Sequence, residues 1–179
     1  MKNKNPLLKF QILSVIFAGI LGTILHFTYE WSNQNILVGT FSSVNESTWE
    51  HLKLAFLPTL ITTIIGYFIF KDTRFNFLCA KTLGILVTLS FIIIFFYTYT
   101  GIIGKDIPIL SIGSFFVSII LGEYLAYKII NSNYSCDNSI AMIVLTLLFV
   151  CFVNFTFFPP KIGLFKDPLT NTFGIFKNI

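Results

Sequence analysis

Residues 10–29, F-Q-I-L-S-V-I-F-A-G-I-L-G-T-I-L-H-F-T-Y, decide the fold. This run contains no Asp, Glu, Lys or Arg, and an α-helix of about 20 apolar residues spans the hydrocarbon core of a bilayer. It is longer than the apolar core of a secretory signal peptide, which has about 7–15 residues, and no small-residue cleavage motif follows it. We therefore interpret it as a membrane helix that is retained in the protein.

Further apolar runs of similar length follow along the chain, at residues 49–70, 78–97, 107–130 and 140–158. Hydrophobic residues make up 55% of the chain and charged residues 11%, whereas a soluble domain carries about 25% charged residues. The sequence predicts an all-α, polytopic membrane helix bundle with about five transmembrane helices. We expect one domain over residues 1–179, with an ordered tail over 158–179. The net charge of +4 is spread out, which argues against a nucleic-acid partner.

The distribution of lysine and arginine predicts the orientation, because cytoplasmic loops are enriched in both residues. With a cytoplasmic N-terminus, one side of the bundle collects Lys2, Lys4, Lys9, Lys71, Arg74, Lys81 and Lys128. Lys53 and Lys105 fall on the other side, and the tail, with Lys161, Lys166 and Lys177, is an exception. We expect a multi-pass cell-membrane protein whose residues 23–53 and tail share the extracytoplasmic side. The abundance of Lys, Asn, Ile and Phe indicates a bacterial, AT-rich genome.

The three cysteines, Cys79, Cys136 and Cys151, show neither metal-binding nor redox spacing. The predicted orientation places Cys79 and Cys136 at the cytoplasmic side, where thiols are kept reduced. We therefore expect both to be unpaired.

Polar groups concentrate between Thr23 and Lys53, which holds both histidines and three of the eight acids. His26 and Glu30 are four residues apart at the end of the first predicted helix, so they share a face. Near the start of the next predicted helix the same spacing relates Glu46 to Glu50 and Ser47 to His51. Since a short loop joins the two helix ends, we expect these side chains to converge just inside the outer interface.

Imidazoles and carboxylates at this spacing suit a divalent transition metal such as zinc. We predict His26, Glu30 and Glu50 as the metal ligands and Glu46 and His51 as catalytic groups of a hydrolytic site. Ion-coupled transport through a small permease is an alternative, as are a metal-free hydrolase based on Ser47 and His51 and a non-catalytic partner subunit. Glu46 and Glu50 also fit capping boxes that begin at Ser43 and Ser47, so a purely structural cluster remains open. Membrane lipids are the expected partners, and a homo-oligomer is compatible with the sequence.

Glu123 lies within the fourth apolar run, and an intramembrane carboxylate is a functional candidate. Its alternative is a pairing with Lys128 near the helix end. In the same run, Ser114, Ser118 and Gly122 form a ridge of small residues, which permits close helix packing. The aromatic tail has two interpretations, a lid over the polar cluster or an anchor at the membrane interface.

Three blocks carry a resemblance to a known family: L-H-F-T-Y-E-W-S at 25–32, V-G-T-F-S-S-V-N-E-S-T-W-E-H-L-K at 38–53 and P-P-K-I-G-L-F-K-D-P-L-T-N-T-F-G-I at 159–175. With these blocks the chain resembles a family of small bacterial integral membrane proteins classed as a domain of unknown function. The resemblance covers the whole chain and implies no activity, substrate or cofactor. It associates the loop block with the tail.

Overall fold

The computed structural model describes residues 5–71, 75–134 and 136–175, and its described part is all-helical. Five long helices are apolar enough to cross a membrane, which confirms the predicted bundle. They are α1 (Asn5–Trp31), α3 (Thr48–Phe70), α4 (Phe77–Ile103), α5 (Pro108–Ile130) and α6 (Asn138–Phe157). A short helix α2 (Ile36–Gly39) and a 3-10 turn η1 (Gly163–Phe165) complete the structure.

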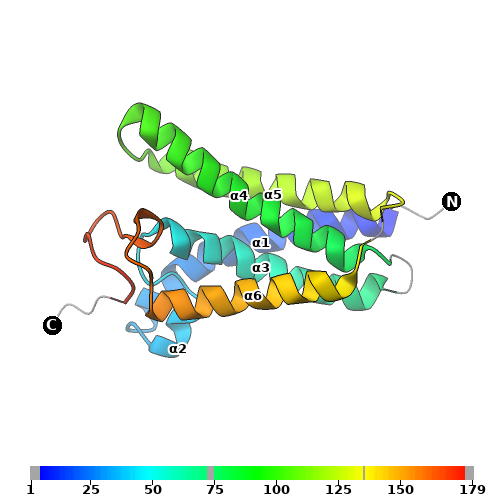
Figure 1. Cartoon of the computed structure of the whole chain (residues 1–179), viewed down its shortest axis with the longest axis horizontal. Coiled ribbons are helices and arrows are strands. Elements are labelled where there is room, and N and C mark those ends of the chain that lie inside the picture. Colours follow the sequence, from blue (N-terminus) through cyan, green and yellow to red (C-terminus); the bar gives the residue numbers. More distant parts are fainter. Residues whose placement is uncertain (1–4, 72–74, 135, 176–179) are drawn as a thin grey trace.

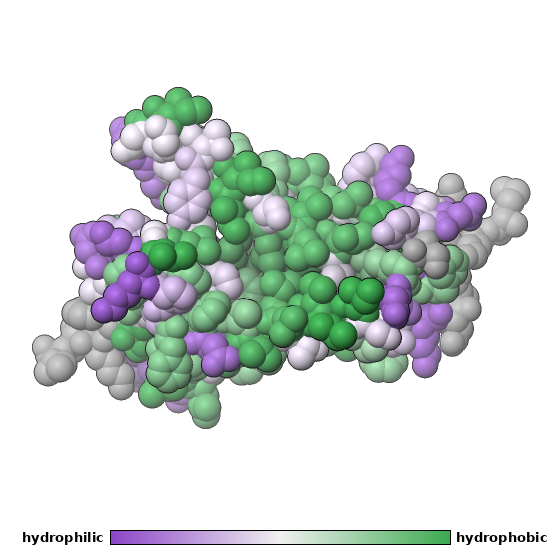
Figure 2. Space-filling view, in the orientation of Figure 1, coloured by the Kyte–Doolittle hydropathy of each residue, from purple (hydrophilic) through white to green (hydrophobic). Residues whose placement is uncertain are grey.

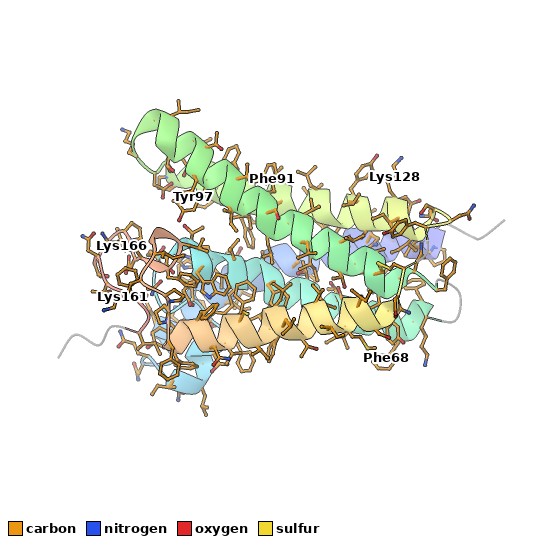
Figure 3. The ribbon with its side chains drawn as sticks, viewed as in Figure 1. Phe68, Phe91, Tyr97, Lys128, Lys161 and Lys166 are labelled. Carbon is orange, nitrogen blue, oxygen red and sulfur yellow. A yellow bond between two sulfur atoms is a disulfide. The ribbon has the colours of Figure 1, made fainter. Side chains whose placement is uncertain are left out.

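The five long helices run side by side, with the start of α1 at one end and the tail at the other (Figure 1). We call the end formed by the end of α1, α2, the start of α3 and the tail the site end. Lys161 and Lys166 lie at this end and Lys128 at the opposite one (Figure 3). Between them the visible surface is largely apolar (Figure 2), as a bilayer-spanning surface requires.

Small residues allow α4 and α5 to pack closely at their crossing, as the sequence predicted for α5. A methyl group on Gly84 would lie 2.5 Å from the Gly122 carbonyl oxygen, so neither glycine has room for a side chain. The Thr88 hydroxyl donates a hydrogen bond across this contact to the Ser118 carbonyl, at 3.1 Å. The crossing therefore fixes the register of the α4–α5 hairpin.

The connection between α1 and α3 is held to the bundle by its own polar side chains. The Ser42 hydroxyl accepts hydrogen bonds from the Tyr29 N–H (3.0 Å) and the Thr28 hydroxyl (2.8 Å). Asn35 caps α2, where the sequence predicted only a loop. Ser47 caps α3 by accepting from the Glu50 N–H at 3.4 Å, which confirms the predicted helix start.

The tail returns to the start of α3, so it shares one end with residues 23–53 as predicted. The Asn45 amide donates to the Gly174 carbonyl at 2.9 Å, and the Phe165 ring packs on Trp49 with centroids 4.8 Å apart. Phe158 and Leu169, in contrast, are 79% and 77% exposed, which suits an interfacial anchor. Residues 176–179, at the end of the predicted ordered tail, lie outside the described residues.

The prediction of unpaired thiols is wrong for Cys79 and Cys136, which form a disulfide; Cys151 is free. The first turn of α4 and the segment before α6 pack together, with Cα atoms 6.3 Å apart across a separation of 57 residues. No spacing or motif in the sequence predicts this proximity. The cytoplasm would keep this pair of cysteines reduced. The disulfide therefore favours the extracytoplasmic side for Cys79 and Cys136, whereas the distribution of positive charges predicts the cytoplasmic side.

Two lysines expected among the charges that flank the helices are instead buried inside the bundle. Lys53 is 0% exposed in α3, and Lys81 is 1% exposed in α4. Each pairs with a buried carboxylate, as described below. The predicted orientation also rests on four charged residues that lie outside the described residues: Lys2, Lys4, Arg74 and Lys177.

Candidate functional site

His26, Glu46 and His51 converge at the site end from three different segments. The Nε2 atoms of His26 and His51 are 3.3 Å apart. The Glu46 Oε2 atom lies 3.3 Å from the His51 Nε2 atom and 3.6 Å from that of His26. Three potential ligand atoms thus occupy the corners of a small triangle, contributed by α1, the α2–α3 connection and the first turn of α3.

Helix packing places the two histidines opposite each other. Gly22 of α1 faces α3 so closely that a methyl group there would lie 2.7 Å from the Leu54 carbonyl oxygen. His26 follows Gly22 by four residues in α1, and His51 precedes Leu54 by three residues in α3. Each histidine therefore lies one helical turn from the Gly22–Leu54 contact, on the face that its helix turns to the other. The His26 ring also packs on Phe27, with centroids 4.9 Å apart.

Glu46 is positioned by the turn that begins α3. The Asn45 side-chain oxygen accepts from the Ser47 N–H at 2.9 Å, a local bond that fixes the backbone around Glu46. Hydrogen bonds from His26 and His51 hold the pKa of the Glu46 carboxyl well below its usual range. Glu46 is therefore the anionic member of the group.

The group is accessible from outside the protein. The side chains of His26, Glu46 and His51 are 30%, 39% and 36% exposed. They are thus half-buried, held by the protein on one side and open on the other.

The structure brings together only some of the predicted site residues. Of the predicted metal ligands, His26 is in the group, while Glu30 and Glu50 are not. Glu30 is exposed, one turn beyond His26, and its carboxylate has no hydrogen bond or ion pair to any described residue. Glu46 and His51, predicted as catalytic groups, supply the other two potential ligand atoms.

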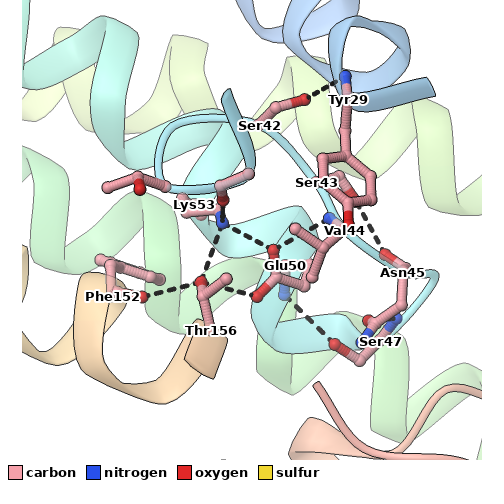
Figure 4. A network of polar contacts seen from close by, with 12 residues as sticks. Tyr29, Ser42, Ser43, Val44, Asn45, Ser47, Glu50, Lys53, Phe152 and Thr156 are labelled. Carbon is pink, nitrogen blue, oxygen red and sulfur yellow. Dashed lines mark hydrogen bonds and ion pairs between the residues drawn. The ribbon is translucent and has the colours of Figure 1, made fainter. Parts of the chain in front are cut away.

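Glu50, predicted as a metal ligand, lies outside this group in a separate, buried network (Figure 4). Its carboxylate pairs with Lys53 at 2.7 Å and accepts from the Val44 N–H (3.2 Å) and the Thr156 hydroxyl (3.0 Å). The Lys53 ammonium also donates to the Gly39 carbonyl and to Thr156, both at 2.9 Å. The network ties α2, α3 and α6 together.

The triangle has the dimensions of a metal site. Two ligands bound at about 2.05 Å to a tetrahedral zinc ion lie about 3.3 Å apart. The separations of 3.3, 3.3 and 3.6 Å between the three ligand atoms match this value. If both imidazoles donated to Glu46, their Nε2 atoms would be two donors 3.3 Å apart with no hydrogen bond between them. A cation bound between the three atoms would give each of them a partner.

A second ionisable cluster lies within the membrane-spanning helices. Lys81 of α4 forms an ion pair with Glu123 of α5, and the Lys81 ammonium is 3.5 Å from the Gln11 side-chain oxygen. Lys128, the alternative partner predicted for Glu123, instead lies over the Tyr124 ring. Glu123 Oε2 and Gln11 Nε2 are buried with no hydrogen-bond partner among the described residues. The sequence flagged Glu123 as intramembrane, but it offered no signal for Lys81.

Comparisons with known proteins place the chain in a family. No curated protein and no solved structure matches it. One family model, described as a family of unknown function (DUF6512), matches residues 1–175. This confirms the resemblance to a family of unknown function, and since the match covers nearly the whole length, the chain belongs to that family.

Proposed function

We propose that the protein binds a divalent transition metal ion, zinc in preference, through His26, Glu46 and His51, and uses it for hydrolysis at the outer membrane surface. The observation that carries the proposal is the triangle of three ligand atoms, whose 3.3–3.6 Å edges suit tetrahedral coordination. Two histidines and one glutamate form a ligand set that catalytic zinc sites use.

The open side of the group supports catalysis over a purely structural role. Structural zinc sites are closed by four protein ligands, whereas catalytic sites keep one position for water or substrate. Here three side chains supply ligands, and all three are partly exposed. A metal ion held by these three residues would lower the pKa of a bound water to about 7.

The reaction that fits is the hydrolysis of an ester. The water oxygen bonds to the carbonyl carbon or the phosphorus, and the bond to the leaving oxygen breaks. One water proton ends on that leaving oxygen, and the other belongs to the acid product. Glu30 is the residue we assign to proton transfer, because it is the only acid of α1 and its exposed carboxylate has no partner among the described residues.

Metal analysis tests the proposal directly. We expect protein purified without chelators to carry about one zinc ion per chain. His51→Ala should weaken zinc affinity by on the order of 100-fold or more, because losing a ligand costs at least as much as losing one of its supporting groups. Isothermal titration with zinc measures this change.

Glu30→Gln is the matched control, since it removes a neighbouring carboxylate that is outside the triangle. It should leave zinc affinity within about 3-fold of the original value while lowering the rate of ester hydrolysis by about 100-fold or more. Metal-free purified protein, or equal zinc affinity in the original chain and His51→Ala, contradicts the proposal.

Ion-coupled transport is the second candidate, and the buried Lys81–Glu123 pair is the observation that favours it. Ionisable groups inside a membrane are costly and commonly mark ion pathways. Transport predicts proton or sodium flux into liposomes that Glu123→Gln abolishes and His51→Ala leaves intact. The absence of flux in liposomes that hold folded protein contradicts it.

A further inference from the structure

The outer part of the α4–α5 hairpin separates from the rest of the bundle at the site end. Figure 1 shows its tip standing away from α3 and the tail, and Figure 2 shows a notch at this place. Further from the hairpin tip, α1 and α5 are in contact. A methyl group on Gly19 would lie 2.9 Å from the Phe116 ring, and one on Gly22 would lie 2.6 Å from Phe115. Nearer the hairpin tip, a methyl group on Gly113 would have no atom within 4 Å.

The group formed by His26, Glu46 and His51 lies at the level where the hairpin is separated from the rest of the bundle. α1 and α5 run in opposite directions. Moving from Gly22 to His26 along α1 therefore covers the same distance, and in the same direction along the bundle, as moving from Phe115 back to Ser111 along α5. The distance is about 6 Å in each case. Gly22 faces Phe115, and His26 repeats that face one turn further along. His26 therefore lies one turn beyond the contact between α1 and Phe115, on the face of α1 that α5 covers there, and His51 lies beside it.

The hairpin wall of the notch is apolar and exposed. Ile112 precedes Phe115 by three residues and Phe116 by four, so it shares the face that α5 turns to α1. Ile112 is 61% exposed, Phe116 is 42% exposed and Ile109, one further turn along, is 78% exposed. Tyr97 of α4, 43% exposed, also projects from the hairpin on the side of the tail (Figure 3).

The occupant of such a notch follows from its position. Its hairpin wall belongs to the candidate membrane spans Phe77–Ile103 and Pro108–Ile130. At that depth the surrounding solvent is hydrocarbon, and apolar side chains have no driving force to exclude acyl chains. The half-exposed group of His26, Glu46 and His51 lies at the end of the spans, where lipid head groups begin.

We propose that the substrate is a membrane lipid that enters sideways through this notch, with its acyl chain against Ile112 and Phe116 and its head-group ester at His26, Glu46 and His51. This inference rests on the proposed metal-dependent hydrolysis. It makes the hairpin a specificity element for amphipathic substrates: a soluble ester reaches the group from the aqueous side, while a lipid requires the notch.

A pair of hydroxamates tests lateral entry without requiring turnover, because both bind zinc-site metals through the same head group. The protein is loaded with cobalt in lipid nanodiscs, and changes in the cobalt absorption spectrum report binding. Acetohydroxamate enters from water, while hexadecanoyl hydroxamate enters from the bilayer. In Ile112→Trp, whose larger side chain fills the notch, we expect binding of the long-chain probe to weaken at least 10-fold and that of acetohydroxamate to change less than 3-fold.

Ile143→Trp is the matched control, since Ile143 is a 58% exposed isoleucine near the start of α6, at the end of the bundle opposite the hairpin tip. It should leave the binding of both probes unchanged. Equal long-chain binding in Ile112→Trp and the original chain overturns lateral entry while leaving the metal site standing. A protein that takes up no cobalt removes the proposed function itself.

Discussion

Lys53→Met will lower the free energy of unfolding by about 3–5 kcal/mol, the cost of removing one partner from a buried ion pair. Lys53 is 0% exposed, and among the described residues its ammonium is the only cation paired with Glu50, which is 2% exposed. Without Lys53, the Glu50 carboxylate stays buried with hydrogen bonds from Val44 and Thr156 alone. The Gly39 carbonyl also loses its donor.

Replacing both partners should not restore this stability. In Glu50→Gln/Lys53→Met the charges are gone, but Gly39 and Thr156 have still lost the ammonium that joins them. Unfolding of the purified protein in mixed detergent, followed by tryptophan fluorescence, measures each change. Lys166→Met, which removes an exposed lysine from the same end, is the control and should shift stability by less than about 0.5 kcal/mol. A similarly small shift in Lys53→Met would mean that the network contributes little.

The sequence predicted the helices well because membrane spans are a local property. Each of the five runs is long and apolar by itself, so no knowledge of neighbours was needed to place it. The missed elements have non-local causes. Helix α2 forms where Asn35 caps a short apolar segment, and the Cys79–Cys136 bond depends on a packing contact between residues 57 positions apart.

The candidate site was predicted in part, for the same reason. Helical spacing correctly indicated that His26 and His51 lie near two adjoining helix ends. It could not tell Glu46 from Glu50, because their exposure depends on partners elsewhere in the chain. Glu50 faces Lys53 and Thr156 in the interior, whereas Glu46 precedes α3 and faces the histidines.

The two buried ion pairs differ from the group at His26 in how their charges are balanced. The Glu50–Lys53 and Lys81–Glu123 clusters each pair one acid with one buried lysine. The group at His26 contains an anionic carboxylate and two imidazoles, has no lysine and is partly exposed. Buried pairs of the first kind hold helices together, while an accessible set of potential ligands can receive a cation.

Lys81→Met should destabilise the protein as strongly as Lys53→Met, by about 3–5 kcal/mol, but the loss should be reversible by a second change. Lys81 is 1% exposed and Glu123 is 5% exposed, and removing the lysine leaves an unpaired carboxylate between α4 and α5. Apart from each other, the only polar partner that either charge contacts among the described residues is Gln11, at 3.5 Å. Lys81→Met/Glu123→Met therefore removes both charges, and only the Gln11 side chain loses a hydrogen-bond partner.

We expect the double variant to recover most of the stability that either single variant loses, since apolar pairs of similar volume replace buried ion pairs at little cost. The same fluorescence measurement of unfolding gives all three values, and Lys128→Met, near the end of the same helix hairpin, is the control. The contrast with Glu50→Gln/Lys53→Met is the decisive comparison, because both pairs are buried and differ in how many other groups depend on them. If the double variant at Lys81 and Glu123 is no more stable than the single variants, the charges at this site are required beyond their mutual neutralisation, as an ion pathway would demand.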